Sequence, residues 1–403
     1  MLHTDNTHRP LIFIVNCDWR DIFRTAPAEF EAKIKRDHLG LDQNDFFYLS
    51  FAHINYNLTV KNFSTRHLKT YLGFIKPWLD LKALWAVPLT IYRYHLRPTV
   101  WLAYDFGSLP ALSLARAIWG GTIVMVLTNQ PRFYSSTRQF GAFKSVYSFF
   151  LERLFSGLPN YFMTINETMK SYLLDLQVPA HKIKIFSTDT INRDQVWLKQ
   201  ARSGRVRAKL GLSSTAKIVL SVGRLEPEKN FSELITLFAT LPADYVLIIL
   251  GQGRMLASLQ AEIKAKNLEG RVFFPGFVSR EDIWNYYLDA NVFVLLSKAE
   301  ALGMVFWEAM YLGVPVIGST ASGIVETIGA DFDRGRLWQT EDKVEVFKEK
   351  IFSCVEASTA KDAMCARAKA YVEVKIKNSV TLNDIIDMSH NEKKISGQSL
   401  LSD

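Results

Sequence analysis

The stretch SKAEALGMVFWEAMYLGVPVIGS, residues 297 to 319, holds two carboxylates, Glu300 and Glu308, on either side of Gly303. Because it follows the apolar run NVFVLL, we expect a strand to end at Leu296, a loop to follow and a helix to begin near Gly303. The first backbone N–H groups of a helix have no partner within it and attract anions. A carboxylate accepts hydrogen bonds from vicinal hydroxyls. The spacing therefore suits a ligand with phosphate between two hydroxyl-bearing rings.

This spacing also has a simpler interpretation. Glu300 would then be a carboxylate at a helix start, which the helix dipole favours, and Glu308 a solvated residue on the helix surface. The two residues alone leave both interpretations open.

A second segment, SVGRLEPEKN at 221 to 230, begins at the end of a predicted strand and carries Arg224 and Lys229 just after Gly223. Open parallel sheets bind ligands at the carboxyl ends of their strands, and two cations there suit a diphosphate. The alternative is a charged turn in which the two cations pair with Glu226 and Glu228.

Two more loops follow predicted strands. LGQGRM, residues 250 to 255, contains Gly251 and Gly253, and VFFPGFVS, residues 272 to 279, contains Val278. Glycine allows a ligand to approach the backbone closely, although glycines also mark ordinary tight turns.

Short apolar runs alternate with longer amphipathic stretches along the chain, a pattern that favours parallel sheets covered by helices. The predicted strands are 11–16, 46–52, 99–104, 121–128, 161–165 and 182–186 in the first half, and 217–222, 245–250, 272–277, 291–296 and 314–319 in the second. We therefore predict an α/β protein with two domains built on parallel sheets, at residues 1–195 and 196–388, the second ending in helices, and a flexible tail at 389–403. A chain of 403 residues is long enough for two cores.

Composition favours a cytoplasmic protein. The three cysteines, Cys17, Cys354 and Cys365, are scattered without a metal-binding spacing, and the N-terminus lacks the order of a secretory signal. No apolar run reaches the roughly 20 residues that span a bilayer.

The positive charge is concentrated in one region. Residues 51–160 hold twelve basic and three acidic residues, and the overall net charge is +8. Aromatic residues alternate with these cations, so we expect residues 61–155 to bind the anionic inner face of the cell membrane peripherally. The alternative is an ordinary surface over an aromatic core; we expect no nucleic-acid partner, since no such motif is present.

Taken together, SVGRLEPEKN, the GQG loop, FPGFVS, SKAEALGMVFWEAMYLGVPVIGS and ASGIVETIG resemble, in order, the C-terminal half of the retaining nucleotide-sugar glycosyltransferases of the GT-B fold, family 4 or group 1. The resemblance covers roughly residues 217–330. It implies two Rossmann-like α/β/α domains with parallel sheets facing across a cleft. The first, 1–195, would bind the acceptor, and the second, 196–388, would bind the donor, with its end packing back on the first. It also implies a UDP- or GDP-sugar donor, with no cofactor and no metal.

The resemblance further implies roles for particular residues. Arg224 and Lys229 would contact the donor diphosphate, Glu300 the transferred sugar, and Glu308 the ribose. The catalytic set would be Glu300, Arg224 and Lys229. The other donor-binding residues would be Gly223, Gly251, Val278, Ala301, Leu302, Gly303, Met304 and Glu308.

The first half departs from the family at two loops. The loop after the first strand reads NCDWRD without glycine, so we expect Asp18 and Arg20 to replace a phosphate contact or face the acceptor. Asn129 stands where many members have a histidine near the reaction centre, which leaves a general base in doubt. A retaining reaction by front-face departure needs no such base.

The expected activity is therefore transfer of a sugar, with retention, to the hydroxyl of a lipid-linked or polysaccharide acceptor. The alternatives are a catalytically silent nucleotide-sugar-binding scaffold and another GT-B enzyme, such as a sugar-nucleotide epimerase or an inverting transferase.

Overall fold

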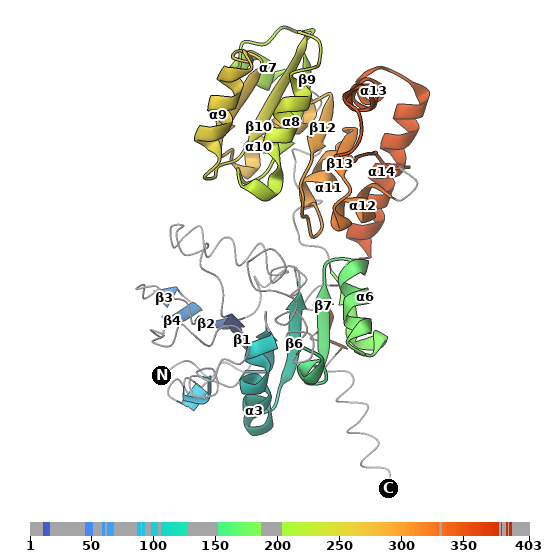
Figure 1. Ribbon diagram of the computed structural model, residues 1–403. Helices are drawn as coiled ribbons and strands as arrows, with labels where there is room; N and C mark the ends of the chain where they lie inside the picture. The colour runs from blue at the N-terminus through green and yellow to red at the C-terminus, as the bar shows by residue number, and fades with distance from the viewer. Residues whose placement is uncertain are drawn as a thin grey trace. The chain divides into compact units, whose positions relative to one another are not determined.

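The computed structural model describes residues 11–16, 45–50, 59–60, 63–67, 87–89, 91–92, 98–103, 106–127, 152–186, 204–329, 333–378, 380, 384–385 and 387–388. The chain divides into two compact units, residues 1–189 with 379–403 and residues 190–378 (Figure 1). Each unit is built on a mainly parallel sheet, so the predicted α/β class is confirmed.

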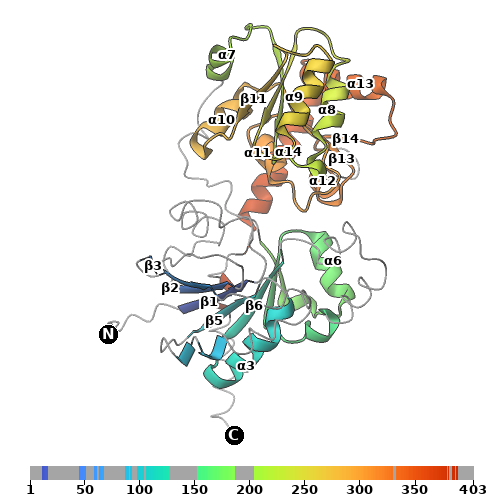
Figure 2. The ribbon, with the colours of Figure 1, turned by 60° about the vertical axis from the view of Figure 1, so that its left-hand side comes forward.

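The first unit contains an eight-stranded sheet among the residues described there, in the order β3-β4-β2-β1-β5-β6-β7-β8 (Figure 2). The strands are β1 Leu11–Asn16, β2 Asp45–Ser50, β3 Thr59–Val60, β4 Phe63–His67, β5 Val100–Ala103, β6 Thr122–Leu127, β7 Tyr161–Thr164 and β8 Ile183–Ile185. All neighbours are parallel except β3 and β4. Helices α3 Leu109–Trp119 and α6 Glu167–Asp175 connect strands of this sheet.

Helix α3 shows why the first unit folds as it does. Its apolar positions Leu109, Leu112 and Ala115 recur at helical spacing and are completely buried in a cluster that includes Trp101 and Phe162. Burying each of the two leucines stabilises the unit by about 1.5–3 kcal/mol. Arg116, on the same helix, donates to Asn160 Oδ1 at 2.8 Å and so ties α3 to the segment before β7.

The second unit contains a six-stranded parallel sheet in the order β11-β10-β9-β12-β13-β14. Its strands are β9 Lys217–Val222, β10 Tyr245–Leu250, β11 Val272–Gly276, β12 Val292–Leu295, β13 Val316–Ser319 and β14 Arg336–Trp338. Its helices are α7 Arg205–Lys209, α8 Phe231–Phe238, α9 Leu256–Ala265, α10 Arg280–Asp289, α11 Met304–Tyr311, α12 Ser322–Ile328, α13 Val344–Val355 and α14 Thr359–Lys377. The last two confirm the predicted helical C-terminal stretch.

The strand order of the second unit determines where a ligand can bind. The chain runs outward from β9 to β11, returns to β12 beside β9, and then continues to β14. This is the order of dinucleotide-binding domains, and the crevice lies where the order reverses, outside the carboxyl ends of the two central strands. The loops after β9 and β12 therefore flank the expected site.

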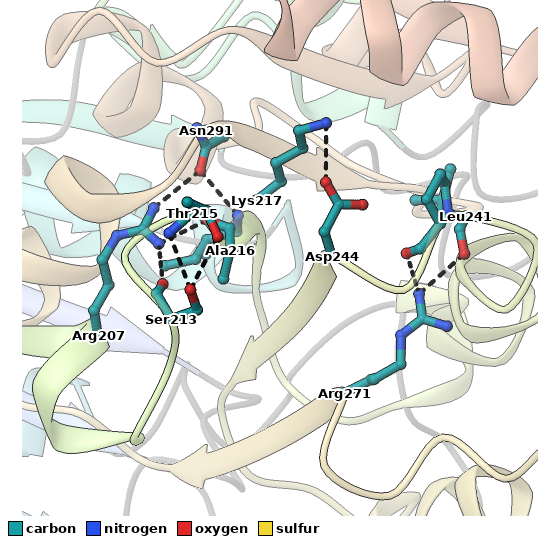
Figure 3. A network of polar contacts seen from close by, with 11 residues as sticks. Arg207, Ser213, Thr215, Ala216, Lys217, Leu241, Asp244, Arg271 and Asn291 are labelled. Carbon is teal, nitrogen blue, oxygen red and sulfur yellow. Dashed lines mark hydrogen bonds and ion pairs between the residues drawn. The ribbon is translucent and has the colours of Figure 1, made fainter.

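Polar contacts link the segments at the amino ends of the strands of the second sheet, opposite the expected site (Figure 3). Asn291, just before β12, accepts hydrogen bonds from the N–H of Ile218 at 2.9 Å and from Arg207 at 3.3 Å. Lys217 pairs with Asp244 at 3.1 Å, while Arg271 donates to the carbonyls of Leu241 and Pro242. These groups satisfy one another, so the cations at this edge have structural partners.

Three strands were absent from the sequence-based prediction. β3 and β14 span two and three residues, too short for an alternating pattern to be recognised, and β4 reads FSTRH, with little apolar character. Their assignment depends on backbone pairing with a neighbouring strand rather than on composition.

Burial gives Cys354 a packing role. The residue lies on α13 and is completely buried, and this burial raises the pKa of its thiol to about 12. A thiol in that state behaves as a small apolar side chain.

Candidate functional site

An ion pair joins the two segments on which the sequence placed the site. Lys229 ends the short 3₁₀ turn Pro227–Lys229 after β9, and Glu300 lies in the loop after β12. The Lys229 Nζ and Glu300 Oε2 atoms are 2.5 Å apart, and the two side chains are only 15% and 16% exposed. The N–H of Lys298 also donates to the carbonyl of Glu228 at 2.8 Å. The two loops that flank the strand-order reversal are thus held together.

Helix α11 begins beside this ion pair. Its N-cap, Gly303, has a φ of 68°, in the left-handed region that favours glycine, and no side chain caps the helix. Ala301 and Leu302 form the loop that enters the helix, and Met304 is its first residue. The positive end of the α11 dipole therefore lies next to Glu300, where an anion would be stabilised.

Glu308 occupies a different environment from Glu300. It lies about one turn after Met304, the first residue of α11, is 7% exposed, and accepts a hydrogen bond from the Tyr287 hydroxyl at 2.8 Å. The interpretation of Glu308 as a solvated helix residue is therefore wrong. A buried carboxylate requires hydrogen-bonding partners, and Tyr287 of α10 supplies one.

We expect Tyr287→Phe to lower the free energy of unfolding by about 1–3 kcal/mol, because it removes a hydrogen bond from a buried carboxylate. Urea denaturation of the purified protein measures this loss. The neighbouring Tyr286 provides a matched control, since its buried hydroxyl has no hydrogen-bond partner within the described residues. Tyr286→Phe should change stability by less than about 0.5 kcal/mol. Equal effects of the two changes would contradict this role of Tyr287.

The glycines after β9 and β10 bring two loops into contact. Gly251 has a φ of 140°, and a Cβ on it would overlap the carbonyl oxygen of Gly223. The Gly251 N–H donates to the carbonyl of Gly276 at 2.9 Å, so the end of β11 is joined to the loop after β10. Val278 follows β11 and is half-buried, whereas Phe277 beside it is 74% exposed. Loop packing explains the need for glycine at 251; contact with a nucleotide stays a prediction.

The charged turn after β9 agrees in part with the alternative interpretation. Arg224 pairs with Glu228 at 3.2 Å, but Glu226 pairs with Arg254 at 2.7 Å, and Lys229 reaches Glu300. The Arg224 side chain is 67% exposed, so this pair contributes at most about 1 kcal/mol. Arg224 can therefore exchange Glu228 for another anion at little cost.

Several predicted features lie outside the described residues. These are Asp18, Arg20, Asn129 and most of the surface at 61–155. Within the part of the chain that is described, no group of three His, Cys, Asp or Glu side chains is placed to hold a metal ion. None of the described helices combines the length and the apolar character needed to cross a membrane.

Three residues that support the site were not predicted from the sequence. Tyr287 holds Glu308, and Trp307 and Thr327 are hydrogen-bonded to each other below the Glu300 loop. None of them has a fixed spacing to the residue that it supports, and aromatic residues at such positions read as ordinary core.

Residues 203–371 match the family described as Glycosyl transferases group 1. One relative, alpha-monoglucosyldiacylglycerol synthase of Streptococcus pneumoniae, is 27% identical over 157 residues, 38% of this chain and 35% of the relative. N-acetylgalactosamine-N,N'-diacetylbacillosaminyl-diphospho-undecaprenol 4-alpha-N-acetylgalactosaminyltransferase of Campylobacter jejuni is 32% identical over 164 residues, 40% of this chain and 44% of the relative. The matches thus span less than half the length of these relatives.

Solved structures share the fold over nearly the whole chain. Anabaena HepE in complex with UDP has a TM-score of 0.67 at 18% identity, covering 96% of this chain and all of its own. Sucrose-phosphate synthase of Thermosynechococcus elongatus has a TM-score of 0.68 at 17% identity, with 97% and 100% covered. Residues 203–371 are therefore similar to the group 1 glycosyl transferases, and the two α/β domains have the GT-B fold of these solved structures.

Proposed function

We propose that this protein transfers a sugar from a nucleoside-diphosphate sugar to a hydroxyl acceptor, with retention at the anomeric carbon. The contact between Lys229 and Glu300 is the observation that carries the proposal. It brings a cation and a carboxylate, 71 residues apart in the chain, to the strand-order reversal beside the start of α11, where no side chain caps the helix. A donor needs these groups together: cations and amides for the diphosphate, and an acceptor of hydrogen bonds for the sugar.

In this proposal the ion pair orients both of its members for the donor. The Lys229 ammonium has three hydrogens, so it can keep Glu300 and still donate to a phosphate oxygen. Glu300 has a second oxygen for the hydroxyls of the transferred sugar. As the sugar–phosphate bond breaks, negative charge grows on the departing diphosphate, and Lys229, Arg224 and the α11 amides would stabilise it. No metal is invoked in this scheme.

The ribose and the base of the donor would lie along the carboxyl ends of the strands. Glu308, held by Tyr287, would accept the ribose hydroxyls from inside α11. The base would lie near Val278 and Phe277, since the exposed Phe277 ring offers a face for stacking. Related GT-B structures were solved with UDP and with UDP-glucose, which supports a donor of this class.

The acceptor is proposed to be a lipid-linked or polysaccharide hydroxyl. The names of two relatives contain a diacylglycerol and a diphospho-undecaprenol, which supports a lipid-linked substrate. The acceptor roles of Asp18, Arg20 and Asn129, and peripheral membrane binding through 61–155, stay predictions.

Thermal unfolding in the presence of UDP-, GDP- and ADP-sugars tests the proposal. A ligand at 100 times its Kd adds about 2.7 kcal/mol of stability, and 1 kcal/mol raises the Tm of a domain this size by about 2–4 °C. We expect such a rise with one base and little with the others. Incubation of that donor with candidate acceptors, followed by NMR of the product, should show a retained anomeric configuration.

The rival functions give different results in these assays. A silent scaffold would bind the donor without turnover, an epimerase would convert the donor without an acceptor, and an inverting transferase would give the opposite anomer. Absence of both stabilisation and product with every donor would refute the proposal.

A further inference from the structure

Helix α12 holds the loop that carries Glu300 through two hydrogen bonds. The N–H of Gly323, near the start of α12, donates to the carbonyl of Glu300 at 3.2 Å. The hydroxyl of Thr327, one turn further, donates to the carbonyl of Leu302 at 3.0 Å. Gly323 also fits closely here, since a Cβ on it would overlap the backbone of Ala301. One short helix thus binds two carbonyls of the loop, two residues apart.

The Thr327 hydroxyl, which donates to Leu302, also accepts a hydrogen bond. Its Oγ1 accepts from the indole N–H of Trp307 at 3.2 Å, and Trp307 lies on α11, next to Glu308. Thr327 is completely buried, and Trp307 and Leu302 are nearly so. The Thr327 hydroxyl therefore links α12 to α11 and to the Glu300 loop through two buried hydrogen bonds, one from the Trp307 indole and one to the Leu302 carbonyl.

Further contacts hold α12, which carries Thr327, in place. Arg334 donates to the carbonyls of Glu326 and Thr327, each at 2.9 Å, and so fixes the last turn of α12. Its guanidinium lies 4.0 Å from the ring centroid of Tyr371 on α14, and the Tyr371 ring meets the Trp307 ring edge to face with their centroids 6.2 Å apart. The end of α12 is thereby held against α14, which leaves the Thr327 hydroxyl little freedom to move.

A fixed Leu302 carbonyl has a geometric consequence for the loop. The peptide between Leu302 and Gly303 is planar and trans, so its N–H points opposite to its carbonyl. Anchoring that carbonyl on Thr327 sets the direction of the Gly303 N–H and of the chain entering α11. The Gly323 bond does the same for the Glu300 carbonyl, on the residue whose side chain meets Lys229.

We propose that Thr327 is a positioning residue for sugar transfer: its hydroxyl, bridging Trp307 and Leu302, holds the loop 300–304 in the conformation that receives the donor. This inference rests on the proposed function, because the loop is the place assigned to the donor sugar and diphosphate. Thr327 itself touches neither of them in this scheme and acts through the backbone of Leu302.

Thr327→Val and Thr327→Ser provide the test. Valine has nearly the shape of threonine but lacks the hydroxyl, so it leaves the Trp307 N–H and the Leu302 carbonyl buried without that partner. We expect kcat/KM for the donor to fall about 10–100-fold, as for other small displacements of catalytic geometry, with the acceptor KM unchanged. Serine keeps the hydroxyl and should retain activity within about threefold of the wild type.

Thr240→Val serves as a matched control. The Thr240 hydroxyl also donates to a backbone carbonyl, that of Leu237 at 2.7 Å, but it lies after α8 near the amino edge of the sheet. Its loss should lower stability without changing the donor kinetics. All variants are assayed well below their unfolding midpoints; where Thr327→Val does not fold, Thr327→Ala removes the hydroxyl with less crowding and gives the same comparison with serine.

The outcomes separate this inference from the proposed function. A wild-type protein that neither binds nor transfers any nucleotide sugar refutes the function, and the inference with it. An active wild type with equal donor kinetics in the serine and hydroxyl-free variants refutes the role of Thr327 alone. A loss confined to the hydroxyl-free variants, absent from Thr240→Val, supports it.

Discussion

Glu300→Gln is expected to reduce sugar transfer by about 10²–10³-fold, the range seen when one stabilising group is removed from a reaction centre. Glutamine keeps the shape of the side chain but loses its negative charge and one of its two acceptor oxygens. It can no longer neutralise Lys229, which lies 2.5 Å away, nor bind the sugar hydroxyls at two points. Steady-state transfer with the donor identified by thermal unfolding measures the effect.

Asp342→Asn is the matched control for Glu300→Gln. Asp342 pairs with Lys350 at 2.8 Å, with side chains 24% and 21% exposed, so a similarly buried pair is lost away from the predicted site. Burial alone would raise the pKa of Asp342, but hydrogen bonds from Lys350 and the Gln339 N–H outweigh it and lower the pKa. The pair therefore stabilises the fold at neutral pH and less as pH falls through that lowered pKa. Asp342→Asn should reduce stability and leave transfer unchanged.

Full activity in Glu300→Gln would contradict the role assigned to Glu300. Inactivity accompanied by global unfolding would instead assign the residue a structural role, so circular dichroism and the urea midpoint accompany the kinetics. We expect the midpoint of Glu300→Gln to shift no more than that of Asp342→Asn, because both variants lose one ion pair of similar burial.

Gly251→Ala is expected to destabilise the protein by about 3 kcal/mol or more, through left-handed strain and overlap with backbone that cannot move aside. A Cβ at this position would overlap the carbonyl oxygen of Gly223 and come within 2.9 Å of its carbonyl carbon. The collision would separate the loops after β9 and β10, so donor-induced stabilisation should also be lost. Thermal unfolding with and without the donor measures both effects.

Gly270→Ala separates backbone strain from collision. Gly270 also has a positive φ, 79°, but a Cβ there would have no atom within 4 Å. Its substitution should cost only the strain, about 1 kcal/mol, and should leave donor binding intact. If the two variants were equally stable, close packing of the Gly223 and Gly251 loops would not be the reason for glycine at 251.

The sequence alone was sufficient for much of the second unit. β9 and β10 coincide with the predicted ranges, because both are runs of buried aliphatic residues bounded by polar turns. The start of α11 beside Gly303 was also predicted, and the left-handed conformation of this N-cap favours glycine. These features depend on residues close together in the chain, and local preference is what a sequence pattern records. The roles of Arg224, Gly223 and Val278 stay predictions.

Tertiary structure decided the rest, because it depends on contacts between distant residues. Lys229 could have paired with Glu226 or Glu228 in its own turn, and only the pairing of β9 with β12 places it against Glu300. Glu308 is indistinguishable from a surface residue in sequence until α10 covers it with Tyr287. Thr327 acquires its two partners only where α12 packs below the Glu300 loop. The sequence by itself determined the longer apolar strands and the end of the second sheet that carries the charged loops; packing determined the short strands and which side chains meet, since burial and pairing are properties of the folded chain.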